Sequence, residues 1–131
     1  MIGLDTNIIV RYLAQDDPTQ SPKATQLIEE RLTQRDPGFV SVVAMVETAW
    51  VLERAYGLAD GEIAAAIGSL LQTDVLVLEH EQEVFTAMIA LKSGLGSFAD
   101  ALISALGANA GCARTLSFDR KASRIPGFEL L

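Results

Sequence analysis

The chain has very little of what most metal and redox sites are built from. Cys112 is the only cysteine and His80 the only histidine among 131 residues. Neither an intramolecular disulfide nor a structural zinc site of the usual Cys/His type can be assembled from them. Any metal ion held by this chain would therefore need oxygen ligands.

Long apolar runs are absent as well. The longest stretch, residues 39 to 52, is interrupted by Ser41, Glu47 and Thr48, and it is shorter than the roughly 20 residues needed to cross a bilayer. We therefore expect no membrane-spanning segment. The chain runs from Met1 directly into an apolar segment that ends in Asp5, without the basic region and cleavage site of a signal peptide. A cytoplasmic location is expected.

Apolar residues are nevertheless plentiful. They make up 50% of the chain, charged residues make up 21%, and the mean hydropathy is +0.29. A chain of this length and composition can bury one core but not two. We predict a single folded domain over residues 1–131.

The charge is unevenly distributed along the chain. The formal net charge is −7, which is unfavourable for a protein that binds a polyanion. Residues 112–131 hold four basic groups (Arg114, Arg120, Lys121 and Arg124) against two acidic ones, a net +2, while residues 1–111 hold six against 15, a net −9. The basic end is either a phosphate-contacting surface or simply a solvated charge run.

Apolar periodicity predicts alternating strands and helices. Turns rich in Gly, Pro and Asp separate them. Strands separated by helices imply a parallel sheet with helices on both faces. The expected strands are 1–4, 39–40, 75–78, 114–118 and 128–130, and the expected helices are 7–13, 21–32, 41–56, 60–72, 82–92 and 97–110, with caps at Asn7, Ser41, Asp60 and Ser97 and a left-handed Gly57.

Two acidic residues follow predicted strands. Asp5 closes the first strand and Asp119 closes strand 114–118. In an open parallel sheet the ligand site lies beyond the carboxyl ends of the strands. An Asp at a strand-to-helix junction is also a common helix N-cap, so each residue has a purely structural alternative.

Two further carboxylates lie on predicted helices. Asp100 is in the first turn of its helix, where Ser97 and Asp100 also fit a capping box. Glu47 lies in mid-helix among apolar neighbours at spacings of three and four, so a buried or half-buried carboxylate is expected. Its structural alternative is an ion pair with Arg54.

Taken together, these four acids indicate a metal site. Four carboxylates brought together repel one another unless a cation lies between them. Because no histidine or cysteine is near, a hard divalent ion such as Mg²⁺ is implied, which needs only one or two direct carboxylates and keeps several waters. Such a site supports phosphodiester hydrolysis.

Four segments carry a family resemblance. They are Asp5-Thr6-Asn7 within residues 1–11, Val-Glu-Thr at 46–48, Phe-Ala-Asp-Ala-Leu-Ile at 98–103, and Thr-Leu-Ser-Phe-Asp-Arg-Lys-Ala at 115–122. With these segments, in this order and at these separations, nearly the whole chain resembles PIN-domain ribonucleases of the VapC toxin type.

The resemblance implies a three-layer α/β/α fold with a central parallel sheet and endonucleolytic cleavage of RNA with Mg²⁺ or Mn²⁺. By position, Asp5, Glu47, Asp100 and Asp119 would be the metal-binding and catalytic acids, with Thr6 as a polar helper. It also implies a homodimer and a cognate antitoxin that covers the site.

Two other interpretations are compatible with the same residues. A phosphoaspartyl phosphatase also begins with a strand that ends in Asp, but it usually has a second Asp two residues later, where this chain has Asn7. A catalytically silent interaction module with the same fold would use its acids only as caps and as partners for arginines.

Overall fold

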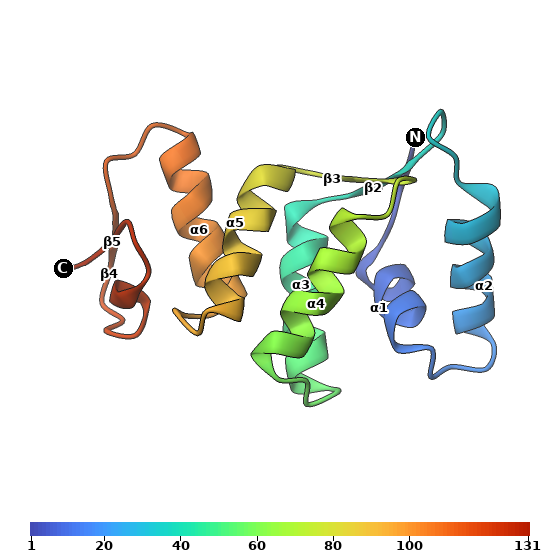
Figure 1. The fold of residues 1–131 in the computed structure, drawn as a ribbon, viewed down its shortest axis with the longest axis horizontal. Coiled ribbons are helices and arrows are strands. Elements are labelled where there is room, and N and C mark those ends of the chain that lie inside the picture. Colours follow the sequence, from blue (N-terminus) through green and yellow to red (C-terminus); the bar gives the residue numbers. More distant parts are fainter.

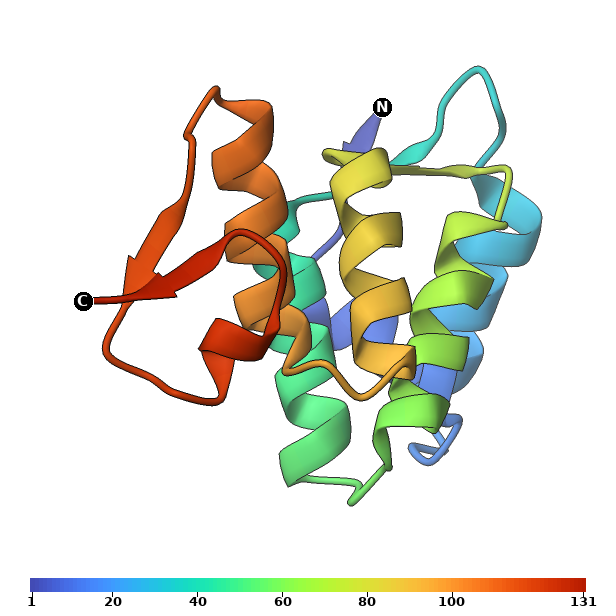
Figure 2. The same cartoon turned by 60° about the vertical axis from the view of Figure 1, so that its left-hand side comes forward.

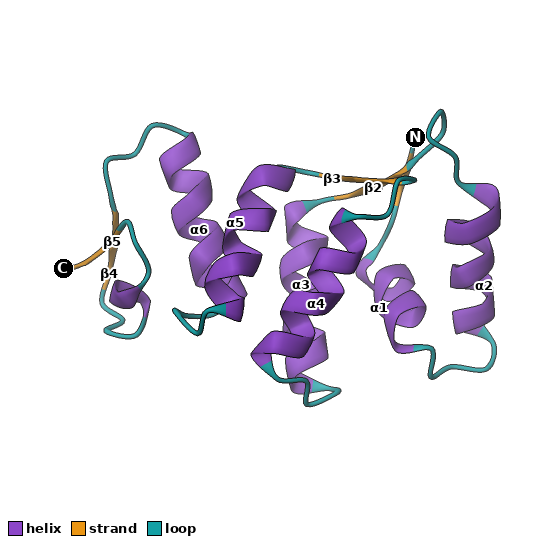
Figure 3. Ribbon diagram, in the orientation of Figure 1, coloured by secondary structure: helices purple, strands orange, loops and turns teal.

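The computed structural model describes residues 1–131 as six α-helices, five short strands and two short helical turns (Figures 1 and 3). Helices α1 and α2 lie at one end of the molecule, α3 and α4 in the middle, and α5 and α6 toward the other end. The elements are β1 (Ile2–Gly3), α1 (Thr6–Ala14), α2 (Gln20–Gln26), η1 (Leu27–Arg31), β2 (Gly38–Val40), α3 (Val42–Arg54), α4 (Asp60–Leu71), β3 (Leu76–Leu78), α5 (Glu81–Lys92), α6 (Phe98–Asn109), β4 (Thr115–Ser117), η2 (Ala122–Arg124) and β5 (Phe128–Leu130).

Three strands form a parallel sheet in the order β1-β2-β3. Gly38 of β2 lies at its centre, paired with Ile2 on one side and Leu76 on the other. Val40 and Leu78 are buried. Because all three strands run the same way, their carboxyl ends share one edge of the sheet, and Asp5 follows the first of them.

The last two strands form a separate parallel sheet, β4-β5. It lies beyond α6 (Figure 2), and in Figure 1 it is far from the N-terminus. The predicted α/β/α class with parallel strands is confirmed. Strand β4 pairs with β5 alone, so the parallel strands are divided between two sheets.

Local signals account for most helix ends. The Ser41 hydroxyl accepts a hydrogen bond from the Ala44 N–H at 3.1 Å, and Gly57 has the left-handed φ of 64° expected after α3. Two predicted caps are wrong. Asn7 and Asp60 are helical residues, and the chain enters those helices at Asp5 and at Ala59, whose N–H donates to the Glu62 carboxylate.

A second correction concerns the predicted helix 21–32. Its first part is α2, and its last five residues form the wider π-helical turn η1. The Asp17 carboxylate accepts hydrogen bonds from the backbone N–H groups of Thr19 and Gln20 just before α2. These two bonds lower the pKa of Asp17 because they favour its charged form, and the bond from Gln20 has the larger effect.

The β4-β5 sheet is fixed to α6. The Ser104 hydroxyl donates to the Pro126 carbonyl at 2.9 Å, and Ile125 is buried in the same apolar core as Phe98 and Leu102. The two sheets are therefore parts of one core, although no strand joins them. No helix of the structure is long and apolar enough to span a membrane.

We predict that Gly38→Ala destabilises the domain. A Cβ at this position would lie 2.8 Å from Leu4 Cδ1 and 2.9 Å from Leu32 Cδ1, and both leucines are buried. The overpacking should lower the free energy of unfolding by about 1–3 kcal/mol in urea titration. Gly3→Ala is the matched control in the same sheet, since its Cβ would meet nothing within 4 Å; equal losses in both variants would contradict the packing argument.

Candidate functional site

Asp5 lies at the carboxyl end of β1, where the chain turns into α1. It occupies the N-cap position with extended backbone angles, but its side chain makes no capping hydrogen bond. The residue is exposed. Its structural alternative is therefore not realised, and the carboxylate is free to bind a ligand.

A hydrogen bond from Thr6 to Glu47 connects the start of α1 to helix α3. The Thr6 hydroxyl donates to Glu47 Oε2 at 2.8 Å, and Thr6 itself is only 7% exposed. Because Thr6 is fixed in the first turn of α1, its hydrogen bond holds the Glu47 carboxylate next to the end of β1. The second Glu47 oxygen has no hydrogen-bond donor.

Glu47 differs from its expected setting in two respects. The residue is exposed, so the expected burial is wrong. The alternative ion pair with Arg54 is not formed either, since the Arg54 guanidinium lies over the Trp50 ring, 5.7 Å from its centroid. A hydrogen bond from Thr6 is the only polar contact that engages this carboxylate.

Asp100 lies in the first turn of α6 and is half-buried. Its N–H donates to the Ser97 hydroxyl at 3.1 Å, which caps the helix. The return bond of a capping box, from the Ser97 N–H to the Asp100 carboxylate, is not formed. The Asp100 carboxylate is thus uncommitted, like that of Asp5.

Asp119 is held in a turn that follows β4. Its carboxylate accepts a hydrogen bond from the Lys121 N–H at 2.8 Å, and its own N–H donates to the Ser117 hydroxyl at 2.9 Å. The helix N-cap considered for this residue is not formed, since Lys121 is the N-cap residue of η2, and the carboxylate holds the preceding turn instead. Asp119 also follows a strand of the second sheet, whereas Asp5 follows a strand of the first.

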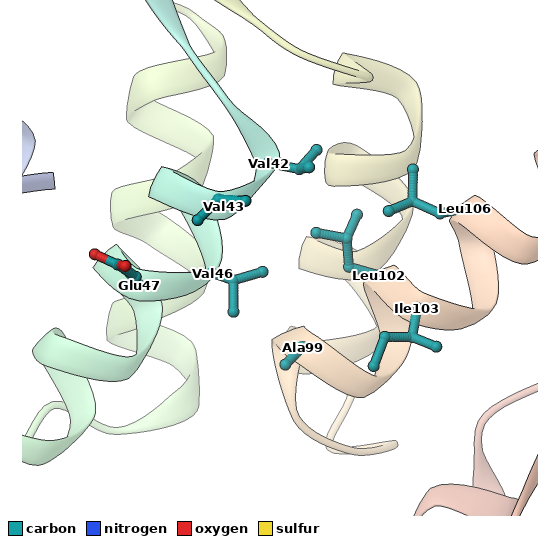
Figure 4. A pocket seen from close by; sticks show the side chains of 8 residues that line it. All are labelled: Val42, Val43, Val46, Glu47, Ala99, Leu102, Ile103 and Leu106. Atoms are coloured by element: carbon teal, nitrogen blue, oxygen red, sulfur yellow. The ribbon is translucent and has the colours of Figure 1, made fainter. Parts of the chain in front are cut away.

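An apolar groove of about 260 Å³ lies between α3 and α6, with Glu47 at its margin (Figure 4). Its walls carry exposed apolar side chains: Val43 is 64% exposed and Ile103 52%. Ala99, which precedes Asp100, also lines the groove, so Glu47 and Asp100 come from the two helices that form it. The lining residues are Val42, Val43, Val46, Glu47, Ala99, Leu102, Ile103 and Leu106.

The structure brings only part of the expected acidic group together. Asp5, Thr6 and Glu47 form one corner, but no group of three or more His, Cys, Asp or Glu side chains comes close enough to hold a metal ion. The chemistry of the donors fits a hard divalent cation, because every donor is oxygen. The corner alone has fewer carboxylates than the four that were expected to bind the metal.

The sequence reasoning missed the groove. Its signal was present, since apolar residues recur at spacings of three and four in 42–46 and in 99–106. Such stripes normally pack into a core. Here part of each stripe is left exposed, at Val43 and at Ile103.

Comparisons with known proteins give one positive result. A family model described as "PIN domain" matches residues 2–127, nearly the whole chain. No significant match is found among curated proteins.

We predict that Glu47→Gln leaves the metal-free protein nearly as stable as the wild type. Only one part-buried hydrogen bond is altered, and a glutamine oxygen can still accept it, so in EDTA the free energy of unfolding should change by less than about 1 kcal/mol. The variant should gain less thermal stability from excess Mg²⁺, because stabilisation follows affinity for the native state. Glu53→Gln on the same helix is the control and should keep the wild-type rise in Tm with Mg²⁺. If Mg²⁺ raises the Tm of both variants equally, Glu47 does not bind the metal.

Proposed function

Because the chain belongs to the PIN domain family, whose fold is generally that of nucleases, we propose that it is a metal-dependent endoribonuclease. The observation that carries the proposal is the corner of Asp5, Thr6 and Glu47 beyond the carboxyl end of β1. Ligand sites of open parallel sheets lie in this position. Both carboxylates are free of the structural roles considered for them.

Each residue of the site has a distinct part in this proposal. Asp5, Glu47 and Asp100 supply carboxylate oxygens for Mg²⁺ or Mn²⁺, with Asp119 as a fourth acid. Thr6 orients Glu47 by engaging Oε2, so that Oε1 faces the ligand. A bound divalent ion would polarise the phosphoryl oxygen and offset the negative charge that develops during hydrolysis.

The basic end of the chain supports an RNA substrate. Arg114 pairs with Glu129 at 3.2 Å, while Arg120, Lys121 and Arg124 are exposed and form no salt bridge. These three cations flank Asp119 and can contact phosphates. They offset the repulsion that the acidic remainder of the chain exerts on RNA.

We further propose that the protein is a VapC-type toxin of a toxin–antitoxin pair. The four segments named above support this subtype, as does the exposed apolar groove next to Glu47, which fits an apolar segment of an inhibitory antitoxin. Under this proposal the protein acts in the cytoplasm and forms a homodimer. The alternative is a catalytically silent interaction module with the same fold. The following experiments distinguish it from an enzyme.

We predict that the purified protein cleaves single-stranded or looped RNA only with Mg²⁺ or Mn²⁺. Incubation with total cellular RNA, followed by mapping of new ends, should show discrete cuts that EDTA abolishes. Cleavage that persists in EDTA would contradict the assignment of the four acids as metal ligands. Intact RNA at every metal concentration would favour the silent module.

We predict that Asp5→Asn and Asp100→Asn each lower the cleavage rate by several orders of magnitude, on the order of 10³ or more, while the fold persists. Both residues are hydrophilic and lack a capping role, so circular dichroism and Tm should change little. Asp74→Asn, an exposed acid in the turn before β3, is the matched control and should cleave normally. Near-normal rates in the folded variants would exclude both acids from the catalytic site.

A further inference from the structure

Phe118, directly after β4, has the most exposed large apolar side chain of the protein, at 82%. Single exposed apolar residues are common on protein surfaces, so exposure alone indicates no site. The ring is also free of the charged groups near it, because the only cation that lies over an aromatic ring is Arg54 over Trp50. The Phe118 ring is therefore available to a ligand.

The turn that carries Phe118 is fixed by hydrogen bonds. The Asp119 N–H donates to the Ser117 hydroxyl at 2.9 Å, and the Lys121 N–H donates to the Asp119 carboxylate at 2.8 Å. Ala122, only 2% exposed, anchors the helical turn η2 that follows. Figure 2 shows this connection at the edge of the molecule, beyond α6. A ring presented by a hydrogen-bonded turn loses little conformational entropy when it binds a ligand.

Three cations follow the ring within six residues. The side chains of Arg120, Lys121 and Arg124 are exposed and form no salt bridge. Glu129, the acid on β5, is paired with Arg114 at 3.2 Å. An exposed aromatic ring beside unpaired cations is the arrangement that binds single-stranded nucleic acid, because bases stack on the ring while phosphates meet the positive charges.

The combination of ring and charge selects the class of ligand. A neutral apolar ligand would use the ring but not the cations, whereas a single strand of RNA uses both. An anionic membrane also combines apolar and negative groups, but stable attachment to it takes a broad apolar face. One ring suffices to stack one base. The surface therefore fits RNA better than a lipid bilayer.

We propose that Phe118 is a stacking platform for an unpaired nucleobase of RNA, and that the three cations after it hold the adjoining phosphates. The bases of a duplex are stacked on one another, so only single strands, loops and bulges offer a base to the ring. The contact selects unpaired RNA without reading its sequence, because every base has a π face. That the bound RNA is a nuclease substrate rests on the function proposed above, but the stacking contact does not.

Binding in EDTA tests the stacking contact without cleavage. The probe is a short fluorescein-labelled single-stranded RNA, followed by fluorescence anisotropy, and the same sequence in a duplex serves as the comparison. Phe118→Ala should raise the Kd for the single strand by about 5- to 100-fold, the effect of losing one stacked base. Phe118→Trp should bind at least as tightly as the wild type, because it keeps an aromatic face. The Tm of both variants should match the wild type, since the ring is exposed.

Phe85→Ala is the matched control. Phe85 is 53% exposed on α5, whose first turn carries Glu81 and Glu83 in place of cations. This variant should bind RNA like the wild type. Equal Kd values for Phe118→Ala and the wild type, an equal loss of duplex binding, or the same loss in Phe85→Ala would overturn the proposal.

Salt dependence separates stacking from charge. Lys121→Gln should weaken the binding of single-stranded and duplex RNA alike. For the single strand, it should reduce the slope of log K against log salt by roughly 0.7, because one phosphate contact is lost. Phe118→Ala should leave this slope unchanged. Vesicles of phosphatidylglycerol test the membrane alternative: vesicle binding that requires Phe118, without any binding of RNA, would overturn the proposal.

Cleavage in Mg²⁺ is measured separately. Under the proposed function, Phe118→Ala should raise KM by the same factor as Kd and leave kcat near that of the wild type, because stacking stabilises the bound substrate and the transition state equally. RNA that binds through Phe118 but is never cut would contradict the proposed nuclease and support the stacking contact. RNA that Phe118→Ala cuts with an unchanged KM would contradict the stacking contact and support the nuclease.

Discussion

Like charges limit how closely carboxylates can lie without a cation, and this constraint applies to every acid of the proposed site. Asp5 precedes Thr6 at the corner between β1 and α1, and the Thr6 hydroxyl donates to the Glu47 carboxylate of α3 and disperses part of its charge. Asp119 lies on a different sheet and uses its carboxylate to hold a turn. Asp119 therefore lies apart from the corner formed by Asp5, Thr6 and Glu47.

The sequence predicted those parts of the fold that depend on neighbours along the chain. Ser41 caps α3 and Gly57 follows it in a left-handed conformation because both signals act within one helical turn. Asn7 and Asp60 were wrong as caps, since Asp5 and Ala59 precede them with the extended backbone angles of a cap. Several consecutive residues could occupy the N-cap position of each helix, and the sequence alone does not show which of them does.

The pairing of β4 could not be predicted in the same way. An alternating pattern of strands and helices indicates parallel strands, but it does not say which strand edges meet, because the partners are distant in sequence. The exposure of Glu47 was missed for a related reason. Its apolar neighbours, among them Val43 and Trp50, were expected to face a core, whereas both are exposed beside open grooves.

The distribution of charge gives the two ends of the chain different tasks under the proposed function. The acidic body presents the oxygen donors that a divalent ion prefers, and the basic end presents Arg120, Lys121 and Arg124 to phosphates. Under the proposed function a net charge of −7 is compatible with RNA binding. The RNA would contact the bound divalent ion and the basic C-terminal residues rather than the acidic rest of the surface.

The central claim is that acids from both sheets bind one divalent ion, and paramagnetic broadening by Mn²⁺ tests it most directly. In ¹H–¹⁵N spectra of the labelled protein, substoichiometric Mn²⁺ should broaden the amide signals of Asp5, Glu47, Asp100 and Asp119 together, and Mg²⁺ should reverse the effect by competition. Broadening confined to acids outside this group, or broadening of Asp5 and Glu47 that leaves Asp119 sharp at saturation, would contradict the account.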